Sequence, residues 1–208
     1  MKPYYSHAGI TIYHGDCREI LPQLGRFDLL LTDPPYGAGY AANPIVGKGK
    51  TESNHEAQTW DEKTVDLRHI LSVCVDAVVW GGNYYALPPS RCWLAWYKRD
   101  SPPSMADMEL AWVSRDMNAR LFDYPIAAVN AERIGHPTQK PLALMKWCLS
   151  LFPEAKTVLD PFMGSGTTLV AAKAMGLTAI GIELHEPYAE IAAKRLSQEV
   201  FDFGGDAA

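Results

Sequence analysis

The sequence has few cysteines, and none of them stands in an arrangement typical of a metal site. The four cysteines are Cys17, Cys74, Cys92 and Cys148. They are scattered along the chain and form no Cys-x-x-Cys pair, and no histidine cluster has the spacing of metal ligands. Such cysteines are typical of reduced, buried thiols, so we expect a cytoplasmic protein with no bound metal. The sequence also shows no signal-peptide pattern and no apolar run that approaches membrane-spanning length. These features argue against a secreted, metal-dependent or membrane protein.

An excess of basic residues is missing as well. The 19 Lys and Arg residues face 24 Asp and Glu residues, which gives a formal net charge of -5. A surface coated in basic residues is thereby excluded, and any contact with nucleic acid must come from a local patch. The chain has 208 residues, 48% of them hydrophobic, and no internal repeat. We therefore expect one domain over residues 1–201, followed by a frayed tail at 202–208.

The most informative stretch follows an apolar run at residues 27–31, which predicts a buried strand. Directly after it comes Thr32-Asp33-Pro34-Pro35-Tyr36. The prolines have no backbone N–H and cannot continue a sheet ladder, so the strand must end in a stiff loop. This loop fixes a carboxylate, free carbonyls and an aromatic ring relative to one another. The alternative is a turn with a surface tyrosine, but Asp and Tyr flanking Pro-Pro favour a clamp for a flat group that bears an NH₂.

A second pattern lies at residues 157–168, where a predicted strand runs into a glycine-rich turn before a helix at 169–175. Glycine lets the backbone approach a ligand closely, and a helix start offers N–H donors. Glu183 ends the next predicted strand, roughly twenty residues beyond the turn, where an acid can bind a ribose diol. The turn alone is weak support, because many such turns are merely tight. Together with Glu183, it predicts a nucleoside ligand.

The rest of the chain supplies the other elements of an α/β protein. Asp16 follows a predicted strand, where it either caps the next helix or meets a ligand, and the local sequence leaves both open. Residues 37–60 are rich in glycine and small polar residues, and we expect a mobile active-site loop there. The other predicted strands are 9–14, 77–80, 91–97, 108–113 and 178–182, and the other predicted helices are 17–24, 61–75, 141–152 and 185–201.

Three motifs together carry a resemblance to a known family. They are Asp-Pro-Pro-Tyr at 33–36, His-Pro-Thr-Gln-Lys-Pro at 136–141 and Asp-Pro-Phe-Met-Gly-Ser-Gly-Thr-Thr at 160–168. In this order they resemble the permuted beta class of DNA amino-methyltransferases, the N6-adenine/N4-cytosine family, in the compact form found in phages and prophages. The resemblance implies a single-domain, Rossmann-like fold with a doubly wound, seven-stranded mixed sheet and a circularly permuted motif order. It also implies S-adenosylmethionine as the methyl donor.

The resemblance assigns roles to individual residues. Asp33 and the carbonyl of Pro34 would accept from the exocyclic amine of a flipped-out base, with Pro35 completing the rigid turn and Tyr36 stacking on the base. Asp16 and Cys17 would meet the adenine of the cofactor, Glu183 its ribose, and Thr138 and Lys140 its methionine carboxylate. Without the other motifs, 136–141 would be interpreted as a helix cap with a solvated lysine. The full expected cofactor set is Asp16, Cys17, Asp33, His136, Thr138, Lys140, Asp160, Phe162, Gly164, Ser165, Gly166, Thr167, Thr168 and Glu183.

The sequence departs from the family in its recognition region. Sequence-specific members carry a sizeable segment before the His-Pro-Thr motif, whereas here only residues 114–135 are available. We therefore expect a short recognition segment, whose target site is short, whose selectivity is relaxed, or whose selectivity is assisted by a partner subunit. We also expect a homodimer. The candidate contacts to DNA phosphates or bases are Lys48, Lys50, Lys98, Arg99, Arg115, Arg120 and Arg133.

The function that the resemblance implies is methylation of adenine N6 in DNA, as in restriction-modification. Aspartate rather than serine at position 33 favours adenine without deciding it. An N4-cytosine DNA methyltransferase or an RNA adenine methyltransferase would keep every motif. A non-catalytic module that only binds the cofactor or DNA would be expected to have lost Asp33 or Tyr36, and both are present.

Overall fold

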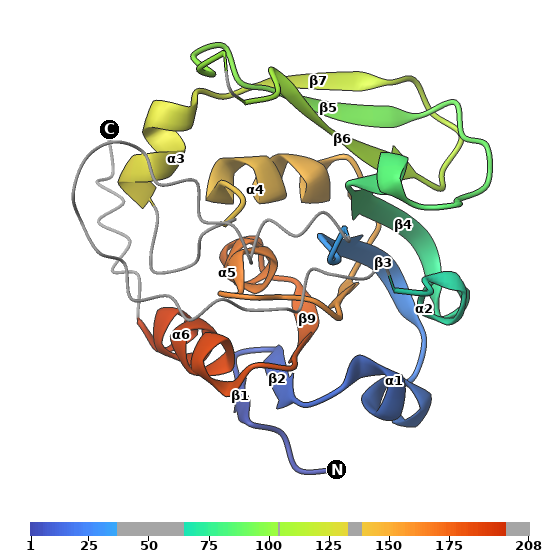
Figure 1. The fold of residues 1–208 in the computed structure, drawn as a ribbon. Helices are drawn as coiled ribbons and strands as arrows, with labels where there is room; N and C mark the ends of the chain where they lie inside the picture. Colours follow the sequence, from blue (N-terminus) through green and yellow to red (C-terminus); the bar gives the residue numbers. More distant parts are fainter. Residues whose placement is uncertain (37–64, 104, 133–138, 199–208) are drawn as a thin grey trace, which may run out of the picture.

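The computed structural model describes residues 1–36, 65–103, 105–132 and 139–198. In this part of the chain, nine strands form one sheet in the order β1-β2-β9-β8-β3-β4-β6-β5-β7 (Figure 1). The strands are β1 (Tyr5–His7), β2 (Ile10–His14), β3 (Phe27–Thr32), β4 (Cys74–Trp80), β5 (Trp93–Tyr97), β6 (Met108–Val113), β7 (Arg120–Asp123), β8 (Thr157–Asp160) and β9 (Thr178–Glu183). The helices are α1 (Cys17–Ile20), α2 (Arg68–Ser72), α3 (Ile126–Glu132), α4 (Leu142–Ser150), α5 (Thr167–Ala174) and α6 (Glu186–Ser197), with short 3₁₀ turns at Leu21–Gln23 and Gly82–Tyr84.

The sheet is mixed, as the resemblance implies, but it has nine strands in the described residues instead of the implied seven. Strands β2, β9, β8, β3 and β4 are parallel, β6 runs antiparallel to β4 and β5, β7 is parallel to β5, and β1 is antiparallel to β2. All seven predicted strands are present, and the additional ones are β1 and β7, the two edges. Both are short and largely exposed, so they lack the apolar pattern by which a strand is recognised.

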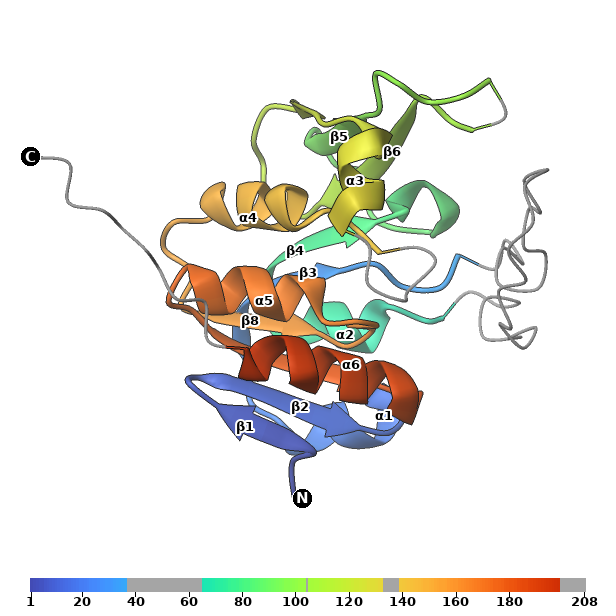
Figure 2. The ribbon, with the colours of Figure 1, turned by 90° about the vertical axis from the view of Figure 1, so that its left-hand side faces the viewer.

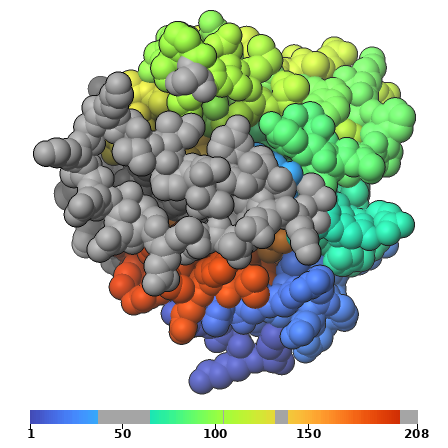
Figure 3. Space-filling view, viewed as in Figure 1, coloured from blue at the N-terminus to red at the C-terminus, as the bar shows by residue number. Residues whose placement is uncertain are grey.

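Helices cover the two faces of the sheet, which gives two hydrophobic clusters. Helices α4, α5 and α6 lie on one face, while α1 and α2 lie on the other (Figure 2). Alternation along the central strands supplies both clusters: Val78 and Trp80 of β4 pack with the α4–α6 side, and Ala77 and Val79 with the α1–α2 side. In the space-filling view, the residues of β5–β7 form the top of the molecule, and α6 with the N-terminal elements forms the bottom (Figure 3).

Strand β3 is the central element that positions the site. Its residues Leu29, Leu30 and Leu31 are fully buried, and it pairs with β8 on one side and β4 on the other. The order of strands along the chain reverses between β3 and β8, which is the switch point where parallel α/β sheets bind ligands. The carboxyl ends of β2, β9, β8 and β3 therefore meet at one edge of the sheet.

One predicted helix, at residues 61–75, is shorter than expected. Within the described residues it comprises only α2, and Val75 lies in β4 with 67% of its surface exposed, instead of facing inward on a helix. Pairing of Cys74 with Phe27 extends β4 toward the N-terminus, and β-branched residues at 73 and 75 suit that conformation.

Two predicted segments fall partly or wholly outside the described residues. The expected mobile loop at 37–60 lies outside them. The expected recognition segment at 114–135 contains β7 and α3, and its last three residues also lie outside. Across the described residues, no helix combines the length and apolarity needed to cross a bilayer.

Candidate active site

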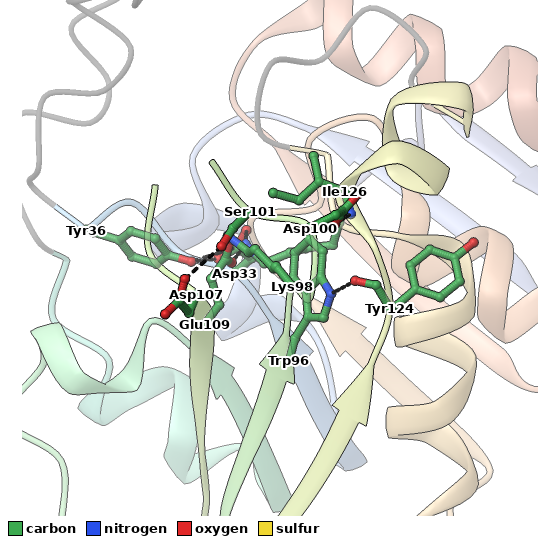
Figure 4. Close-up of polar contacts among 11 residues, drawn as sticks. Asp33, Tyr36, Trp96, Lys98, Asp100, Ser101, Asp107, Glu109, Tyr124 and Ile126 are labelled. Carbon is green, nitrogen blue, oxygen red and sulfur yellow. Dashed lines mark hydrogen bonds and ion pairs between the residues drawn. The ribbon is translucent and has the colours of Figure 1, made fainter. Parts of the chain in front are cut away.

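Asp33 stands directly after β3, at the edge where the strand ends meet. Its Oδ2 lies 2.5 Å from Nζ of Lys140. Its Oδ1 accepts a hydrogen bond from the hydroxyl of Tyr36, and Figure 4 shows these two side chains. The side chain keeps 23% exposure and lines a cavity. Burial raises the pKa of this carboxyl, and the charge of Lys140 opposes that rise. The turn thus presents a fixed hydrogen-bond acceptor to the cavity.

Tyr36 is held by the elements that follow β4. Its ring stacks on that of Tyr84, with centroids 5.1 Å apart and an interplanar angle of 17°. It also lies so close to Gly81 that a Cβ there would come within 2.0 Å of the ring. Gly81 has a φ of 66°, a second reason for glycine at this position. The hydroxyl of Tyr85 donates to the carbonyl of Pro35, so the Pro-Pro turn is fixed from the same side.

Asp160, at the end of β8, is a buried carboxyl. Only 3% of it is exposed, and its Oδ1 accepts from the hydroxyl of Thr32 at 2.8 Å and from the amide of Phe162 at 3.2 Å. Burial raises the pKa of Asp160 to about 6, although these hydrogen bonds oppose the rise. The hydrogen bond to Thr32 ties the end of β8 to the end of β3, beside Asp33.

Glu183, at the end of β9, faces the glycine turn. Its carboxylate oxygens accept from the backbone amides of Gly164 at 2.9 Å and His185 at 2.8 Å, which fixes their direction. Burial raises the pKa of this carboxyl. A Cβ at Gly166 would lie 2.7 Å from Cβ of Ala192, so the turn can pack against α6 only with glycine there.

Asp16 does cap the following helix. Its Oδ1 accepts from the backbone N–H of Arg18 at 2.8 Å, and the Arg18 guanidinium pairs with the same carboxylate. The cap does not exclude a ligand contact, because Asp16 also lines the cavity together with Cys17. Cys17 is buried, and burial raises the pKa of its thiol to about 11.

These strand ends surround one cavity of about 510 Å³. That volume is in the range of small-molecule sites. Its lining contains every described residue of the expected cofactor set except Gly166, which packs behind the turn. The members found in the lining are Asp16, Cys17, Asp33, Lys140, Asp160, Phe162, Gly164, Ser165, Thr167, Thr168 and Glu183. His136 and Thr138 lie outside the described residues.

The cavity also has lining residues that the sequence did not single out. His69 and Ile70 come from α2, and His185 and Tyr188 come from the start of α6. The last two could have been inferred, since they directly follow the acid that ends β9. The contribution of α2 depends on how the helix packs, for which the sequence gives no signal. Among the residues that the structure describes, no group of three or more His, Cys, Asp or Glu is placed to hold a metal ion.

The donor and acceptor groups of the cavity fit S-adenosylmethionine. The carboxylate of Glu183, oriented by two backbone amides beside the glycine turn, suits a ribose diol. Nε2 of His185 is a buried polar atom without a hydrogen-bond partner in the described part of the chain, and its residue lines the cavity. Buried polar atoms are normally paired, so this one is a natural ligand contact. Acidic side chains dominate the charged lining, which suits a sulfonium.

The site also contains a glutamate that the sequence did not reveal. Lys140, which contacts Asp33, also lies 3.0 Å from Oε2 of Glu109, the second residue of β6. Lys98, directly after β5, pairs with the other oxygen of Glu109. Lys98 and Lys140 are only 6% and 8% exposed. The sequence feature that could have indicated Glu109 is its position as the one ionisable residue in the otherwise apolar strand β6.

The structure does not bring the described candidates for DNA contact into one patch. Lys98 is buried against Glu109, and Arg99 pairs with Asp123 at 2.9 Å. Arg115 pairs with Asp76 and Glu154, near the amino ends of β4 and β8, on the side of the sheet away from Asp33. Arg120 is an exposed first residue of the edge strand β7. Lys48, Lys50 and Arg133 lie outside the described residues.

Comparison with known proteins places this chain in a family. The N6/N4 methyltransferase family, described as DNA methylase, matches residues 88–194. The type II methyltransferase M2.DpnII of Streptococcus pneumoniae is 49% identical over an alignment 252 positions long, which covers 95% of this chain and 93% of that protein.

Two solved structures have the same fold. That of the M1.HpyAVI–SAM complex is 26% identical with a TM-score of 0.60, covering 89% of this chain and 99% of the other. The PvuII DNA methyltransferase, named as cytosine-N4-specific, has a TM-score of 0.60 at 18% identity, over 96% of this chain and 90% of that one. The chain belongs to the N6/N4 family of DNA methyltransferases, whose methyl donor is S-adenosylmethionine.

Proposed function

We propose that this protein methylates the exocyclic N6 of adenine in DNA, in a base flipped out of the duplex, and that it is a permuted, beta-class member of its family. The observation that carries the proposal is the carboxylate of Asp33. It stands at the end of β3, is held by Lys140 at 2.5 Å, and opens on the cavity that suits the cofactor. The turn that carries it is rigid, which is the first requirement for positioning a reacting amine.

The chemistry needs help from the protein because an aromatic amine is a poor nucleophile. Its lone pair is delocalised into the ring, and hydrogen bonds from its two protons to Asp33 and the Pro34 carbonyl favour a pyramidal nitrogen. S-adenosylmethionine supplies an electrophilic methyl group on a sulfonium. The nitrogen lone pair forms the new N–C bond, the C–S bond breaks with its electrons going to sulfur, and the nitrogen sheds one proton. Asp33 is the acceptor proposed for that proton.

The observed contacts of Asp33 leave room for this role. Lys140 uses Oδ2 and the Tyr36 hydroxyl uses Oδ1, but each carboxylate oxygen has a second lone pair. An amine can therefore be accepted without first losing Lys140. Tyr36, next to Asp33, is the aromatic ring proposed to stack on the base.

Adenine is proposed over cytosine because position 33 is aspartate. The alternative substrate is N4 of cytosine, since the chain shares its fold with a methyltransferase named as cytosine-N4-specific. An adenine in RNA is a further alternative, because it would present the same amine. The type II methyltransferase named above, nearly half identical, supports a place in a restriction-modification system.

The test is to identify the methylated nucleoside. The protein is incubated with S-adenosylmethionine and either unmethylated duplex DNA or RNA, and the product is digested and analysed by mass spectrometry. We expect N6-methyldeoxyadenosine from DNA. Finding N4-methyldeoxycytidine, or product from RNA alone, would overturn the proposed substrate. The matched variants Asp33→Ala and Asp33→Asn should bind the cofactor nearly normally yet form no product, and turnover near the wild-type rate in either would remove Asp33 from its role.

A further inference from the structure

Behind Asp33, four charged side chains lie in a row and alternate in sign: Lys98, Glu109, Lys140 and Asp33. Lys98 pairs with Oε1 of Glu109, Oε2 of Glu109 lies 3.0 Å from Nζ of Lys140, and Lys140 lies 2.5 Å from Oδ2 of Asp33. The four come from the end of β5, from β6, from the residues before α4 and from the end of β3. Figure 4 shows Lys98 and Glu109 converging on Asp33 and Tyr36.

The ammonium of Lys140 is fully committed within this row. It has three N–H donors, and three acceptors surround it: Asp33 at 2.5 Å, Glu109 at 3.0 Å and the hydroxyl of Tyr36 at 3.3 Å. Burial disfavours its charge, but the two carboxylates outweigh this and raise its pKa well above the usual range. The charges of Lys140 and Lys98 in turn hold the pKa of Glu109 at about 2, against the effect of its burial. Glu109 and Lys140 therefore both carry their charge in this row.

Stability alone does not account for this arrangement. Desolvating each ion costs several kcal/mol, and buried ion pairs can often be replaced by apolar side chains without loss. The consequence that matters lies at Asp33. A lysine shared between two carboxylates holds each of them less tightly than a lysine paired with one, because its donors are divided and because each carboxylate repels the other, as Glu109 does Asp33.

We propose that Glu109 is a positioning residue for methyl transfer: by sharing Lys140, it keeps Asp33 oriented while leaving its carboxylate free enough to accept the target amine. This inference rests on the proposed role of Asp33. Lys98 completes the arrangement, because it neutralises Glu109 and keeps the row at zero net charge. Neither Glu109 nor Lys98 needs to touch the substrate.

The frame around Lys98 supports a positioning role. Its backbone N–H donates to the carbonyl of Asp107 at 2.8 Å, and its ammonium lies 4.8 Å from the ring centroid of Trp96. The indole N–H of Trp96 donates to the carbonyl of Tyr124 at 2.8 Å. The carboxylate of Asp100 accepts from the first backbone amides of α3 at 2.5 and 2.9 Å (Figure 4). The far end of the row is thus anchored in the β5–β6 hairpin and in α3.

The test separates this role from a purely structural one. Glu109→Gln keeps the shape of the side chain but removes its charge, so that Asp33 becomes the one anionic partner of Lys140 in the row. We expect its single-turnover methylation rate, at saturating DNA and S-adenosylmethionine, to fall about tenfold or more, with the cofactor Kd unchanged. Glu109→Asp keeps the charge and should be nearer to the wild-type rate. A wild-type rate in Glu109→Gln would overturn the inference.

The double variant Lys98→Met/Glu109→Gln is the decisive control. It restores the charge balance that Glu109→Gln disturbs, so its Tm should recover toward wild type. Its methylation rate should stay low, because Asp33 is still the one anionic partner of Lys140 in the row. Recovery of the rate together with the Tm would show that Glu109 acts only through charge balance and would overturn the inference. Asp33→Ala in the same assay separates the proposed role of Asp33 from that of Glu109. If Asp33→Ala retains turnover, the proposed function of Asp33 is wrong. If Asp33→Ala is inactive while Glu109→Gln has the wild-type rate, only the role of Glu109 is wrong.

Discussion

Three of the carboxyl groups in and behind this site, those of Asp160, Glu109 and Asp33, have surroundings that give them different proton affinities. Asp160 is buried with only neutral hydrogen-bond donors, and its pKa rises to about 6. Glu109 is flanked by two lysines, which outweigh its burial and hold its pKa at about 2. Asp33 lies between these cases, with burial raising its pKa and Lys140 opposing the rise. The partner, rather than the type of acid, decides which group stays ionised.

The raised pKa of Asp160 makes a prediction about stability. Because the folded-state pKa is higher than in the unfolded chain, this group stabilises the fold at low pH, and that contribution is lost as the pH rises through about 6. The full rise from 3.8 corresponds to about 3 kcal/mol, of which about 1 kcal/mol falls between pH 5 and 8. Asp160→Asn should therefore gain about 1 kcal/mol over wild type between those pH values, measured by urea unfolding.

Asp28 is the matched control for that experiment. Its carboxylate accepts from the backbone amides of Lys156 and Thr157, which lower its pKa. It is ionised in both folded and unfolded states from pH 5 to 8, so the gap between Asp28→Asn and wild type should stay constant there. An Asp160→Asn gap that is equally flat would contradict the assignment of the titration to Asp160.

A second residue-level prediction concerns Glu183 and the cofactor. Loss of a hydrogen-bonded, charged acceptor should weaken S-adenosylmethionine binding by about 1.5–3 kcal/mol in Glu183→Ala. Because the carboxylate also holds the amides of Gly164 and His185, Glu183→Gln, which keeps one acceptor oxygen, should lose less. Titration calorimetry measures both. Glu186→Ala, an exposed acid nearby on α6, is the control, and an affinity in Glu183→Ala equal to that control would place the ribose elsewhere.

At the level of elements, the sequence predicts those whose pattern is local. The apolar run of β3 before Pro-Pro, and the glycine turn between β8 and α5, are recognisable because burial and backbone conformation restrict the residues there. The partners of Lys140 are not recognisable in this way. Glu109 reaches it only because β6 is antiparallel to β4, and Lys98 only because β5 pairs with β6. Such contacts depend on strand order, which spacing along the chain does not encode.

The same limit applies to the edges and to the short helices. β7 and α3 have short, partly exposed sequences whose positions depend on pairing with β5 and on the Asp100 carboxylate. Lys98 illustrates the consequence for function. Its position after an aromatic strand favours a phosphate contact, yet it points inward to a glutamate that the sequence places eleven residues later.

The turn after β4 yields a prediction at this scale. A Cβ in Gly81→Ala would meet the ring of Tyr36 at 2.0 Å, so the ring must move from its stack on Tyr84. We expect a lower methylation rate with cofactor affinity retained. Gly176→Ala is a close control, because Gly176 has a φ of 70° but no atom within 4 Å of its Cβ position. It should cost about 1–2 kcal/mol of stability and keep activity. Equal activity of the two variants would show that the position of Tyr36 does not matter.

At the level of the whole molecule, the expected homodimer stays a prediction. A chain of 23.0 kDa with a short recognition segment presents little surface to DNA, and pairing would enlarge it. Light scattering should give twice the chain mass for the free protein, and two chains per duplex for the complex with DNA. A monomer mass under both conditions would contradict the expectation.

The last prediction concerns how an acidic protein holds DNA. With a net charge of -5, the contact must come from a minority of residues, and several candidates are committed elsewhere: Lys98 is buried, and Arg99 and Arg115 are paired with acids. We therefore expect the phosphate contact to come from Lys48 and Lys50, which follow the Asp-Pro-Pro-Tyr turn in sequence. Each phosphate neutralised contributes about −0.9 to the slope of log K against log salt concentration on duplex DNA.

The double variant Lys48→Ala/Lys50→Ala should therefore flatten that slope by up to about 2, and weaken duplex binding at low salt most, while leaving cofactor affinity unchanged. Fluorescence anisotropy on a labelled duplex over a salt series measures it. Lys156→Ala/Lys194→Ala is the matched control, since it removes the same charge from exposed side chains before β8 and late in α6, toward the amino edge of the sheet. If removing charge anywhere on the surface were enough, both pairs would flatten the slope alike, and a local phosphate contact at Lys48 and Lys50 would be ruled out. A wild-type slope in Lys48→Ala/Lys50→Ala would do the same.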